Sequence, residues 1–329
     1  MTLAFILVVA VLVLGAVLFL RSRRRRHLRE LLQLKLFSVR LPQESVEGKE
    51  VVQEIGRFEQ LVGALAAFRK PFVFEVAVPH VGEEIHFYVA VPGHLGEALI
   101  RQVQSLWGDA QVEPADDYNI FNSSGATDAA WIGQRVRPFL PIRTYREVNA
   151  DTFLPILGGL AKINEIGEGG AVQIVARPTS AGAAKDVRGA LQALRKGWRL
   201  KDVLDHPLSV SLADVTKAIS GKGEDKNQRA EAQKVIDEPA VKALEMKLSK
   251  LLFEVNVRVV ASAPTPQLAT SILVGLTAGF SQFGAPERNE FKVVQPRDLK
   301  TLIYEFSFRE FVADETMLFS LKALDEIKR

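Results

Sequence analysis

Three histidines and two adjacent glutamates are the closest approach of this sequence to a metal-binding or acid/base site. His80, His86 and His94 lie in one short stretch, together with Glu83 and Glu84. A zinc site needs ligands at set spacings, such as two histidines one helical turn apart, and these histidines do not have such a spacing. Adjacent glutamates on a strand point to opposite faces, so they cannot act together as acid and base. We therefore expect no metal site and no catalytic carboxylate pair here.

Nucleotide chemistry would need a glycine-rich phosphate loop, and the two nearest patterns fail. The P-loop pattern, GxxxxGK followed by Ser or Thr, holds phosphates with backbone N–H groups and the lysine. Around Gly221 and Lys222, Thr216 replaces the first glycine and Gly223 replaces the Ser or Thr. Residues 167–172, GEGGAV, do not match the dinucleotide pattern GxGxxG. The sequence has no serine-hydrolase motif either, so we predict a non-enzyme without a cofactor; an enzyme of unrecognised type is an alternative that no residue pattern supports.

A stretch that mixes basic and aromatic residues could bind single-stranded nucleic acid, because aromatic rings stack on bases and arginines pair with phosphates. Its candidate contact residues are Arg135, Arg137, Arg143 and Tyr145, flanked by Trp131, Phe139 and Arg146. An extended strap whose aromatic residues anchor it to the domains on either side would have the same composition. We favour the strap, and nucleic acid is a secondary candidate partner.

The first 20 residues are uncharged and almost entirely apolar, as a membrane-spanning helix requires. About 20 helical residues cross the roughly 30 Å hydrocarbon core of a bilayer. A basic cluster follows at once, made of Arg21, Arg23, Arg24, Arg25 and Arg26, with Arg29 close behind. Basic residues beside a span stay on the cytoplasmic side. We therefore predict an uncleaved, single-pass anchor in the cell (inner) membrane, with the N-terminus outside and the C-terminal body in the cytoplasm.

The net charge of +3 is a local property of this basic cluster. Removing the six arginines from the 42 basic residues leaves 36, against 39 acidic ones. The body is therefore not a basic protein, and topology together with anionic lipid head groups explains the cluster. The chain has no cysteine, which excludes disulfides and thiolate zinc sites.

The fold class predicted behind the anchor is α+β, with two ferredoxin-like α/β sandwich modules. Residues 21–50 form a basic juxtamembrane helix, centred on residues 28–37, and a linker. The first module covers residues 51–120, and its expected elements are a helix over 55–68, strands over 72–78 and 85–91, a helix over 95–107 and a strand over 110–113. Apolar residues three and four apart indicate the helices, and short runs rich in β-branched and aromatic residues indicate the strands.

An extended crossover over residues 121–150 separates the two modules. The second module covers residues 151–329 and includes a polar loop near 219–239. We expect its helices over 153–163, 183–198, 240–251 and 266–280, and its strands over 171–177, 253–260, 291–294 and 302–308. Such a series is compatible with a ferredoxin-like layer.

The order of these segments resembles the N-terminal region of membrane-anchored ATPases linked to conjugation and type IV secretion in bacteria. The resemblance rests on the hairpin FVFEVAV and EIHFYVAVP, the helix ending in Trp107 and Gly108, and the segments DDYNIF, GEGGAVQIVARP, YEFSFREF and MLFSLKAL. In such proteins, the segment similar to residues 317–321 leads into a hexameric DNA-pumping motor. No motor motif occurs in this sequence, so the resemblance implies that the motor is a separate chain.

The resemblance thus implies a non-catalytic membrane anchor and docking module for a DNA-translocating ATPase. A C-terminal helix over residues 318–327 would contact the partner through Leu318, Leu321 and Leu324. Two alternatives stay open: a membrane-tethered module that binds single-stranded nucleic acid, and a self-assembling membrane scaffold, which would be a homo-oligomer.

Overall fold

The structure is a computed structural model that describes residues 34–42, 48–81, 84–143, 152–163, 165–179, 181–205, 237–285 and 288–321. Its strands are β1 (Leu34–Arg40), β2 (Phe72–Val78), β3 (His86–Pro92), β4 (Gln111–Ala115), β5 (Ala126–Gln134), β6 (Gly169–Pro178), β7 (Leu252–Ala263), β8 (Phe291–Val294) and β9 (Met317–Ser320). Its α-helices are α2 (Gly48–Ala67), α3 (Gly96–Leu106), α5 (Leu154–Leu160), α6 (Ala181–Arg195), α7 (Leu200–Asp205), α9 (Glu238–Leu248), α10 (Pro266–Ala278) and α11 (Leu299–Ser307). The predicted α+β class is confirmed.

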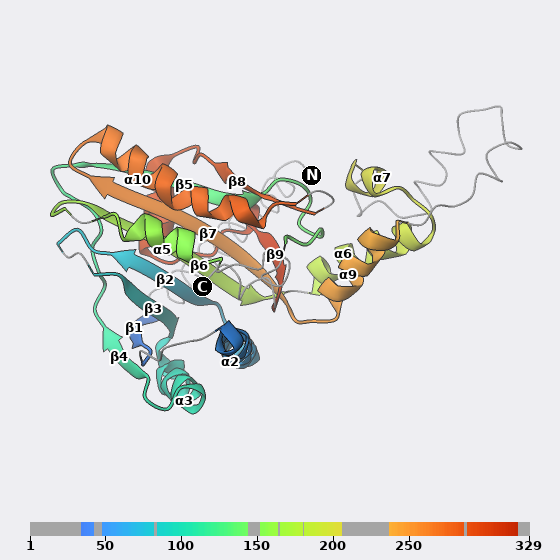
Figure 1. Cartoon of the computed structure of the whole chain (residues 1–329), viewed down its shortest axis with the longest axis horizontal. Coiled ribbons are helices and arrows are strands. Elements are labelled where there is room, and N and C mark those ends of the chain that lie inside the picture. The colour runs from blue at the N-terminus through green and yellow to red at the C-terminus, as the bar shows by residue number, and fades with distance from the viewer. Residues whose placement is uncertain are drawn as a thin grey trace, which may run out of the picture.

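All strands of the described residues join one antiparallel sheet in the order β4-β1-β3-β2-β6-β7-β5-β8, and β9 pairs with β7 (Figure 1). The first half of the chain runs β1-α2-β2-β3-α3-β4. The second half repeats this order as β5-α5-β6-β7-α10-β8, with the helices α6, α7 and α9 inserted between β6 and β7. The two halves meet where β2 pairs with β6, from Phe72 opposite Ala176 to Val78 opposite Gly170. The sheet is therefore continuous across both halves.

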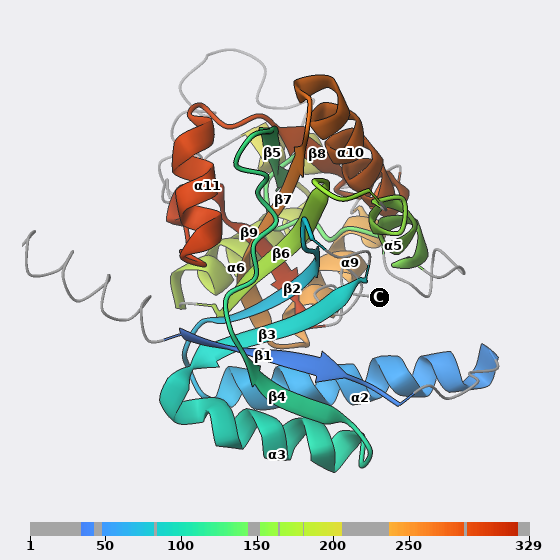
Figure 2. The ribbon, with the colours of Figure 1, turned by 90° about the vertical axis from the view of Figure 1, so that its left-hand side faces the viewer.

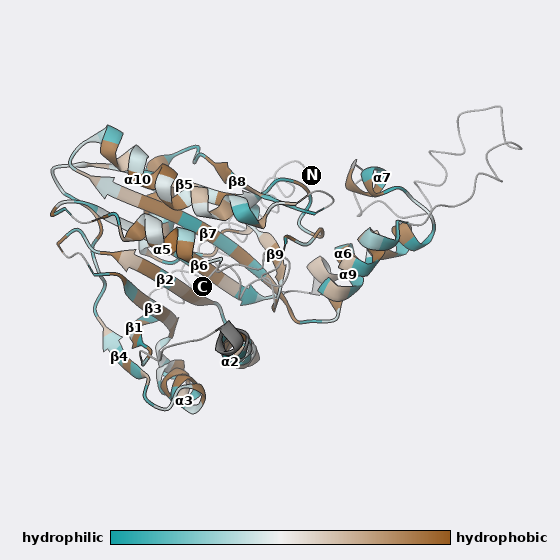
Figure 3. Ribbon diagram, viewed as in Figure 1, coloured by the Kyte–Doolittle hydropathy of each residue, from teal (hydrophilic) through white to brown (hydrophobic). Residues whose placement is uncertain are grey.

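Helices cover both faces of the sheet, but unequally. The side chains of α2, α3, α5 and α10 share one apolar core with one face, whereas α11 packs on the other face (Figure 2). β2 is buried along its whole length because it has helices on one side and the α11 region on the other. Figure 3 shows β7 as a largely hydrophobic strand with hydrophilic bands. Those bands are the polar residues described below.

The inserted helices form an arm that projects from the sheet (Figure 1). Helices α6 and α9 pack together through a third apolar cluster, which also contacts β9 and the segment after β5. Its fully buried members include Val187, Leu194 and Leu244. The side chain of Asp237 accepts a hydrogen bond from the N–H of Ala240 and so begins α9.

Two strands lie where no strand was predicted. Residues 34–37, predicted as part of a juxtamembrane helix, belong to β1, which pairs with β3 and β4. Residues 126–134, predicted as part of the extended crossover, form β5 between β7 and β8. Both strands gain their hydrogen bonds from distant partners, and the local pattern of apolar residues does not reveal these.

Two C-terminal elements exchange type. Of the residues 302–308, predicted as a strand, 302–307 belong to helix α11 and Phe308 is its C-cap. Asp298 begins this helix by accepting hydrogen bonds from the N–H groups of Lys300 and Thr301. Residues 317–320, which overlap the predicted C-terminal helix, form β9 instead. Asp298 is a residue type that commonly begins helices. The alternating aromatic residues of YEFSF nevertheless favoured the prediction of a strand.

Several predictions lie outside the described residues. These are the membrane helix over 1–20, the cluster Arg21, Arg23, Arg24, Arg25 and Arg26, the contact residues Tyr145 and Leu324, and most of the polar loop near 219–239. Within the described part of the chain, none of the helices combines the length and the apolar composition that a bilayer crossing requires.

Candidate functional site

A row of polar residues crosses the buried centre of the sheet on the face that α11 covers. Glu75 of β2 lies opposite Gln173 of β6, which lies opposite Arg258 of β7, which lies opposite Trp131 of β5. Residues directly opposite each other in an antiparallel sheet share a face and touch. Glu75, Gln173 and Arg258 are each at most 1% exposed. We call these four residues the central row.

The central row is linked by hydrogen bonds between its side chains. The Nε2 group of Gln173 donates to the Glu75 Oε1 atom at 2.7 Å, and a terminal nitrogen of Arg258 donates to the Gln173 Oε1 atom at 2.6 Å. The Arg258 guanidinium also lies 4.5 Å from the centre of the Trp131 ring. Buried polar groups cost free energy unless they are paired, so these bonds make the two halves of the sheet depend on each other.

Arg309, just after α11, closes the central row at the first half of the sheet. Its Nε donates to the Glu75 Oε1 atom at 2.9 Å, a terminal nitrogen donates to the Oε2 atom at 3.2 Å, and the other terminal nitrogen donates to Asp117 at 2.8 Å. Arg309 has a φ of 55°, a left-handed conformation that residues other than glycine rarely adopt. The buried carboxylate of Glu75 therefore helps hold the backbone turn that ends α11.

Two residues of β7 hold the chain that follows Arg309. Arg258 donates to the backbone carbonyl of Glu310. The amide nitrogen of Asn256 donates to the carbonyls of Val312 and Glu315, each at 2.9 Å, and its oxygen accepts from the N–H of Val312 at 2.7 Å. Residues 309–315, which we call the C-terminal strap, are thus bound to both halves of the sheet.

The electrostatics of the central row follow from burial and opposite charge. Burial lowers the pKa of Arg258 to about 10, and the nearby carboxylates of Glu305, Glu310 and Glu75 act against this. Burial also acts to lower the pKa of Arg309. The charge and hydrogen bond of Glu75, together with the charges of Tyr118 and Asp117, outweigh burial, and the pKa is raised. Burial, and then the charge of Glu75, raise the pKa of Tyr118 well above its ordinary value. Arg309 and Glu75 form an ion pair, and Arg258 is held by hydrogen bonds to Gln173 and to a backbone carbonyl, which suits a structural clamp better than proton transfer.

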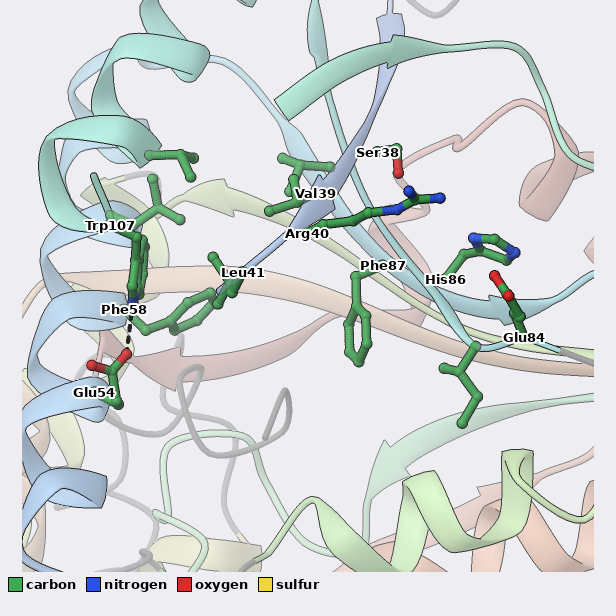
Figure 4. A pocket seen from close by; sticks show the side chains of 14 residues that line it. Ser38, Val39, Arg40, Leu41, Glu54, Phe58, Glu84, His86, Phe87 and Trp107 are labelled. Carbon is green, nitrogen blue, oxygen red and sulfur yellow. Dashed lines mark hydrogen bonds between the residues drawn. The ribbon is translucent and has the colours of Figure 1, made fainter. Parts of the chain in front are cut away.

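A second feature is an apolar cavity of about 430 Å³ at one end of the first half (Figure 4). Its apolar walls come from β1, β3, α2 and α3 and include Val39, Leu41, Phe58, Leu61, Ile85, Phe87, Val89, Val103 and Trp107. The indole N–H of Trp107 donates to Glu54 at 2.7 Å, and Arg57 pairs with the same carboxylate at 2.5 Å. Ser38, Arg40, Glu84 and His86 supply the other polar groups of the lining. This size and composition are typical of ligand pockets.

The predicted nucleic-acid contacts come together only in part. Arg135 pairs with Glu290 and, with Arg137 and Lys201, lines a hollow of about 500 Å³ beside the helical arm. The backbone N–H of Arg143 donates to the carbonyl of Phe283 at 3.0 Å.

The aromatic residues of the same stretch do not form a stacking surface. Trp131 is 5% exposed and Phe139 is 3% exposed. Trp131 packs in the sheet, and Phe139 packs against the helical arm. These two rings therefore act as anchors, as expected if the crossover over residues 121–150 is an extended connection between the two halves.

The structure describes two of the three predicted docking residues, Leu318 and Leu321. Leu318 lies in β9 and is 4% exposed, so it cannot contact a partner in this structure. Leu321 is partly buried against the main core, and its N–H donates to the carbonyl of Leu251 at 2.7 Å. Beside Leu321, Leu251 is 55% exposed. Two further exposed apolar residues are Tyr304 and Phe308 of the α11 region, whose ring centres lie 4.6 Å apart.

Of the histidines and glutamates of the predicted hairpin, Glu83 lies outside the described residues, and His80 and His86 make separate contacts. His80 makes a ring-nitrogen contact of 2.9 Å with the carbonyl oxygen of Asn119, and His86 stacks on Tyr88. Among the described residues, no group of three or more His, Cys, Asp or Glu side chains could hold a metal ion.

The sequence interpretation missed the central row, although a signal was present. Single polar residues interrupt otherwise apolar runs in the segments FVFEVAV, AVQIVAR and FEVNVRVV. A polar residue inside a strand that is buried on both faces must find a buried partner. That rule would have selected Glu75, Gln173 and Arg258, but not their pairing.

Comparisons with known proteins do not assign a class to this fold and site. No protein-family model matches the chain, and a search of curated proteins found no significant match.

Proposed function

We propose that this chain is a non-catalytic membrane anchor and docking module for a DNA-translocating ATPase of the conjugation and type IV secretion kind. The apolar N-terminal segment spans the inner membrane with its N-terminus outside, and the body lies in the cytoplasm. The two halves of the sheet are two ferredoxin-like units, because each has the β-α-β-β-α-β order and the same arrangement of strands. The motor is a separate chain.

The observation that carries this proposal is the attachment of the C-terminal strap to both halves of the sheet. Arg309 binds Glu75 in the first half, while Asn256 and Arg258 in the second half bind the rest of the strap. A segment held at both ends moves with the whole sheet. In the proteins that the sequence resembles, the segment similar to residues 317–321 leads to the motor. A rigid base at this point suits a protein that positions a motor on a membrane.

The docking surface that we assign is the exposed side of α11. Leu302 and Phe306 bury one side of this helix against the sheet, whereas Tyr304 is 42% exposed and Phe308, which follows it, is 39% exposed. Aromatic residues are enriched among the side chains that contribute most to binding at protein interfaces. The aromatic pair lies beside the C-terminal strap, which supports docking at this position.

The test is photocrosslinking from the full chain in its native membrane. A photoreactive amino acid replaces Tyr304, and in a matched control it replaces Val274, which is 60% exposed on α10 and lies on the opposite face of the sheet. We expect capture of an ATPase with a Walker motif from position 304 and not from position 274. Capture of copies of this chain alone would favour the self-assembling scaffold and refute the docking proposal.

Binding of single-stranded nucleic acid is a second candidate function, supported by one observation. Arg135, Arg137 and Lys201 meet at one hollow, where three cations could follow a phosphate backbone. The burial of Trp131 and Phe139 removes the stacking part of that hypothesis. What is left is a sequence-independent, salt-sensitive contact.

A further inference from the structure

We propose that the apolar cavity of the first half binds an anionic amphiphile, a fatty-acyl chain that ends in a carboxylate or phosphate group. The docking function assigns no ligand to this part of the molecule, so the inference goes beyond it. It rests on three properties of the cavity: the parting of two strands, the apolar walls and the charges at the mouth.

The cavity exists because β1 and β3 stop pairing before they end. Their last pair is Ser38 opposite Tyr88. Beyond this pair, β1 stays with β4 as far as Arg40 opposite Gln111, while β3 stays with β2 as far as Ala77 opposite His86. The sheet therefore opens like a fork, and α2 and α3 form the floor of the opening. An elongated ligand can enter between the strands without breaking any pair of the sheet.

The walls of the opening favour hydrocarbon. The aromatic side chains of Phe58, Phe87 and Trp107 line it together with aliphatic residues (Figure 4). Glu54 already accepts from Trp107 and pairs with Arg57, so its carboxylate is not free to bind a polar ligand group. A cavity of about 430 Å³ lies in the range of small-molecule pockets. Burial of an acyl chain here would exclude water from mostly apolar surface.

The mouth supplies the charge that selects the head group. Arg40 is exposed, and its side chain forms no hydrogen bond or ion pair with any described residue. In Figure 4 its guanidinium group extends along the mouth on the side of His86. Guanidinium binds carboxylate and phosphate in a two-point geometry. Glu84 lies on the same rim and repels an anion, so the two residues must affect binding in opposite directions.

The experiment uses the full chain in nanodiscs of phosphatidylcholine, with two photoreactive probes. One probe is a diazirine fatty acid, which carries a free carboxylate, and the other is a diazirine lysophosphatidic acid, a membrane-type phosphate lipid. We expect saturable labelling of peptides that carry residues 85–89 or 103–107. Preference for the first probe identifies a free fatty acid as the ligand, and preference for the second identifies a lipid. Labelling that is absent from these peptides with both probes overturns the proposal.

Four variants give the affinity test. We expect Arg40→Gln to raise the probe concentration at half-saturation about fivefold and Glu84→Gln to lower it about twofold. Changes of this size are expected for exposed charges. Val39→Phe places a larger side chain in the cavity and should lower labelling about tenfold. Arg101→Gln is the matched control, since Arg101 is an exposed arginine of α3 outside the cavity. If Val39→Phe fails to fold, the two rim variants decide: unchanged affinity in both, or shifts of the same sign, overturns the anionic head group.

Discussion

Arg309 and Glu75 are 234 residues apart in the chain, yet two hydrogen bonds join their side chains in the buried centre of the molecule. The Glu75 side chain is 1% exposed and that of Arg309 is 11% exposed. This ion pair connects the end of α11 to strand β2. The same carboxylate accepts from Gln173, which reaches the other half. One pair therefore sits at the junction of three parts of the fold.

Removal of Arg309 should be strongly destabilising. Arg309→Ala leaves the buried carboxylate of Glu75 without its cation, and breaking a buried pair in this way costs about 3–5 kcal/mol. Denaturant unfolding of the full chain in detergent, followed by tryptophan fluorescence, measures the free energy of unfolding. Arg101→Ala is the control, because its pair with Glu97 is exposed and should contribute less than about 1 kcal/mol.

The double variant separates charge from packing. Replacement of both partners, as Glu75→Gln with Arg309→Met, removes both charges of this pair and should recover most of the loss. A double variant as unstable as Arg309→Ala would show that shape, and not charge, holds the C-terminal strap.

Lys247 should make stability depend on pH. It is 3% exposed, its ammonium group donates to the carbonyls of Pro138 and Leu318 at 2.5 and 2.6 Å, and burial lowers its pKa from 10.5 to about 7. Between these two pKa values the unfolded chain binds more protons than the folded chain. The free energy of unfolding should therefore rise as pH increases from about 7 toward 10.5 and should be lost again as pH falls to 7.

Lys247→Met tests this origin of the pH dependence. The variant keeps an unbranched side chain but has no titratable group, so its unfolding free energy should rise less between pH 7 and pH 9.5 than that of the unchanged chain. Urea titrations at the two pH values measure this free energy. An equal rise in the variant and in the unchanged chain would exclude Lys247 as the source.

Two glycines should respond to alanine in opposite directions. A Cβ at Gly169, at the start of β6, would overlap the backbone carbonyl of Ile120, and such overpacking costs about 1–3 kcal/mol. At Gly189, in the interior of α6, a Cβ meets nothing within 4 Å. Alanine there should stabilise the protein by about 0.5–1 kcal/mol, because it restricts the unfolded chain. Thermal unfolding of the two single variants measures the sign of each change in stability. A loss of stability at both positions would contradict the described packing of α6.

The basic hollow makes a prediction about nucleic acid. If Arg135, Arg137 and Lys201 contact three phosphates, their joint replacement by alanine should lower the slope of log affinity against log salt by about 2 for single-stranded DNA. Fluorescence anisotropy with a labelled oligonucleotide measures this slope. Replacement of Lys185, Arg188 and Lys242, which are exposed on the arm, changes the net charge equally. An equal effect of both triple variants would mean that no specific groove exists.

Sequence patterns predicted the elements whose own residues carry a clear period. The helix predicted over 55–68 lies within α2 except for its last residue, and Ile55, Leu61, Val62 and Leu65 are buried there at helical spacing. The apolar runs over 72–78 and 253–260 are strands β2 and β7. Helical spacing identifies the first segment, whereas short length and β-branched or aromatic residues indicate that the two apolar runs are strands.

The wrong predictions concern segments that satisfy two periods. LKLFSVR can place apolar residues on a helix stripe or on alternate faces of a strand, and pairing with β3 and β4 selects the strand β1. YEFSF has the alternation of a strand, yet Asp298 caps it as helix α11, whose residues Leu302 and Phe306 face the sheet. In the first case distant strand partners decided the structure, whereas in the second a local N-cap acted together with packing on the sheet.

By itself, the sequence determined the α+β class and most of the central elements, because local periodicity requires no knowledge of distant partners. Only the tertiary structure decided that β2 joins β6, and that Glu75, Gln173, Arg258 and Arg309 meet. Strand order and register depend on contacts between residues far apart in the chain, which contribute nothing to the local pattern. The central row and the forked cavity both arise from register, so neither could be located before the strands were paired.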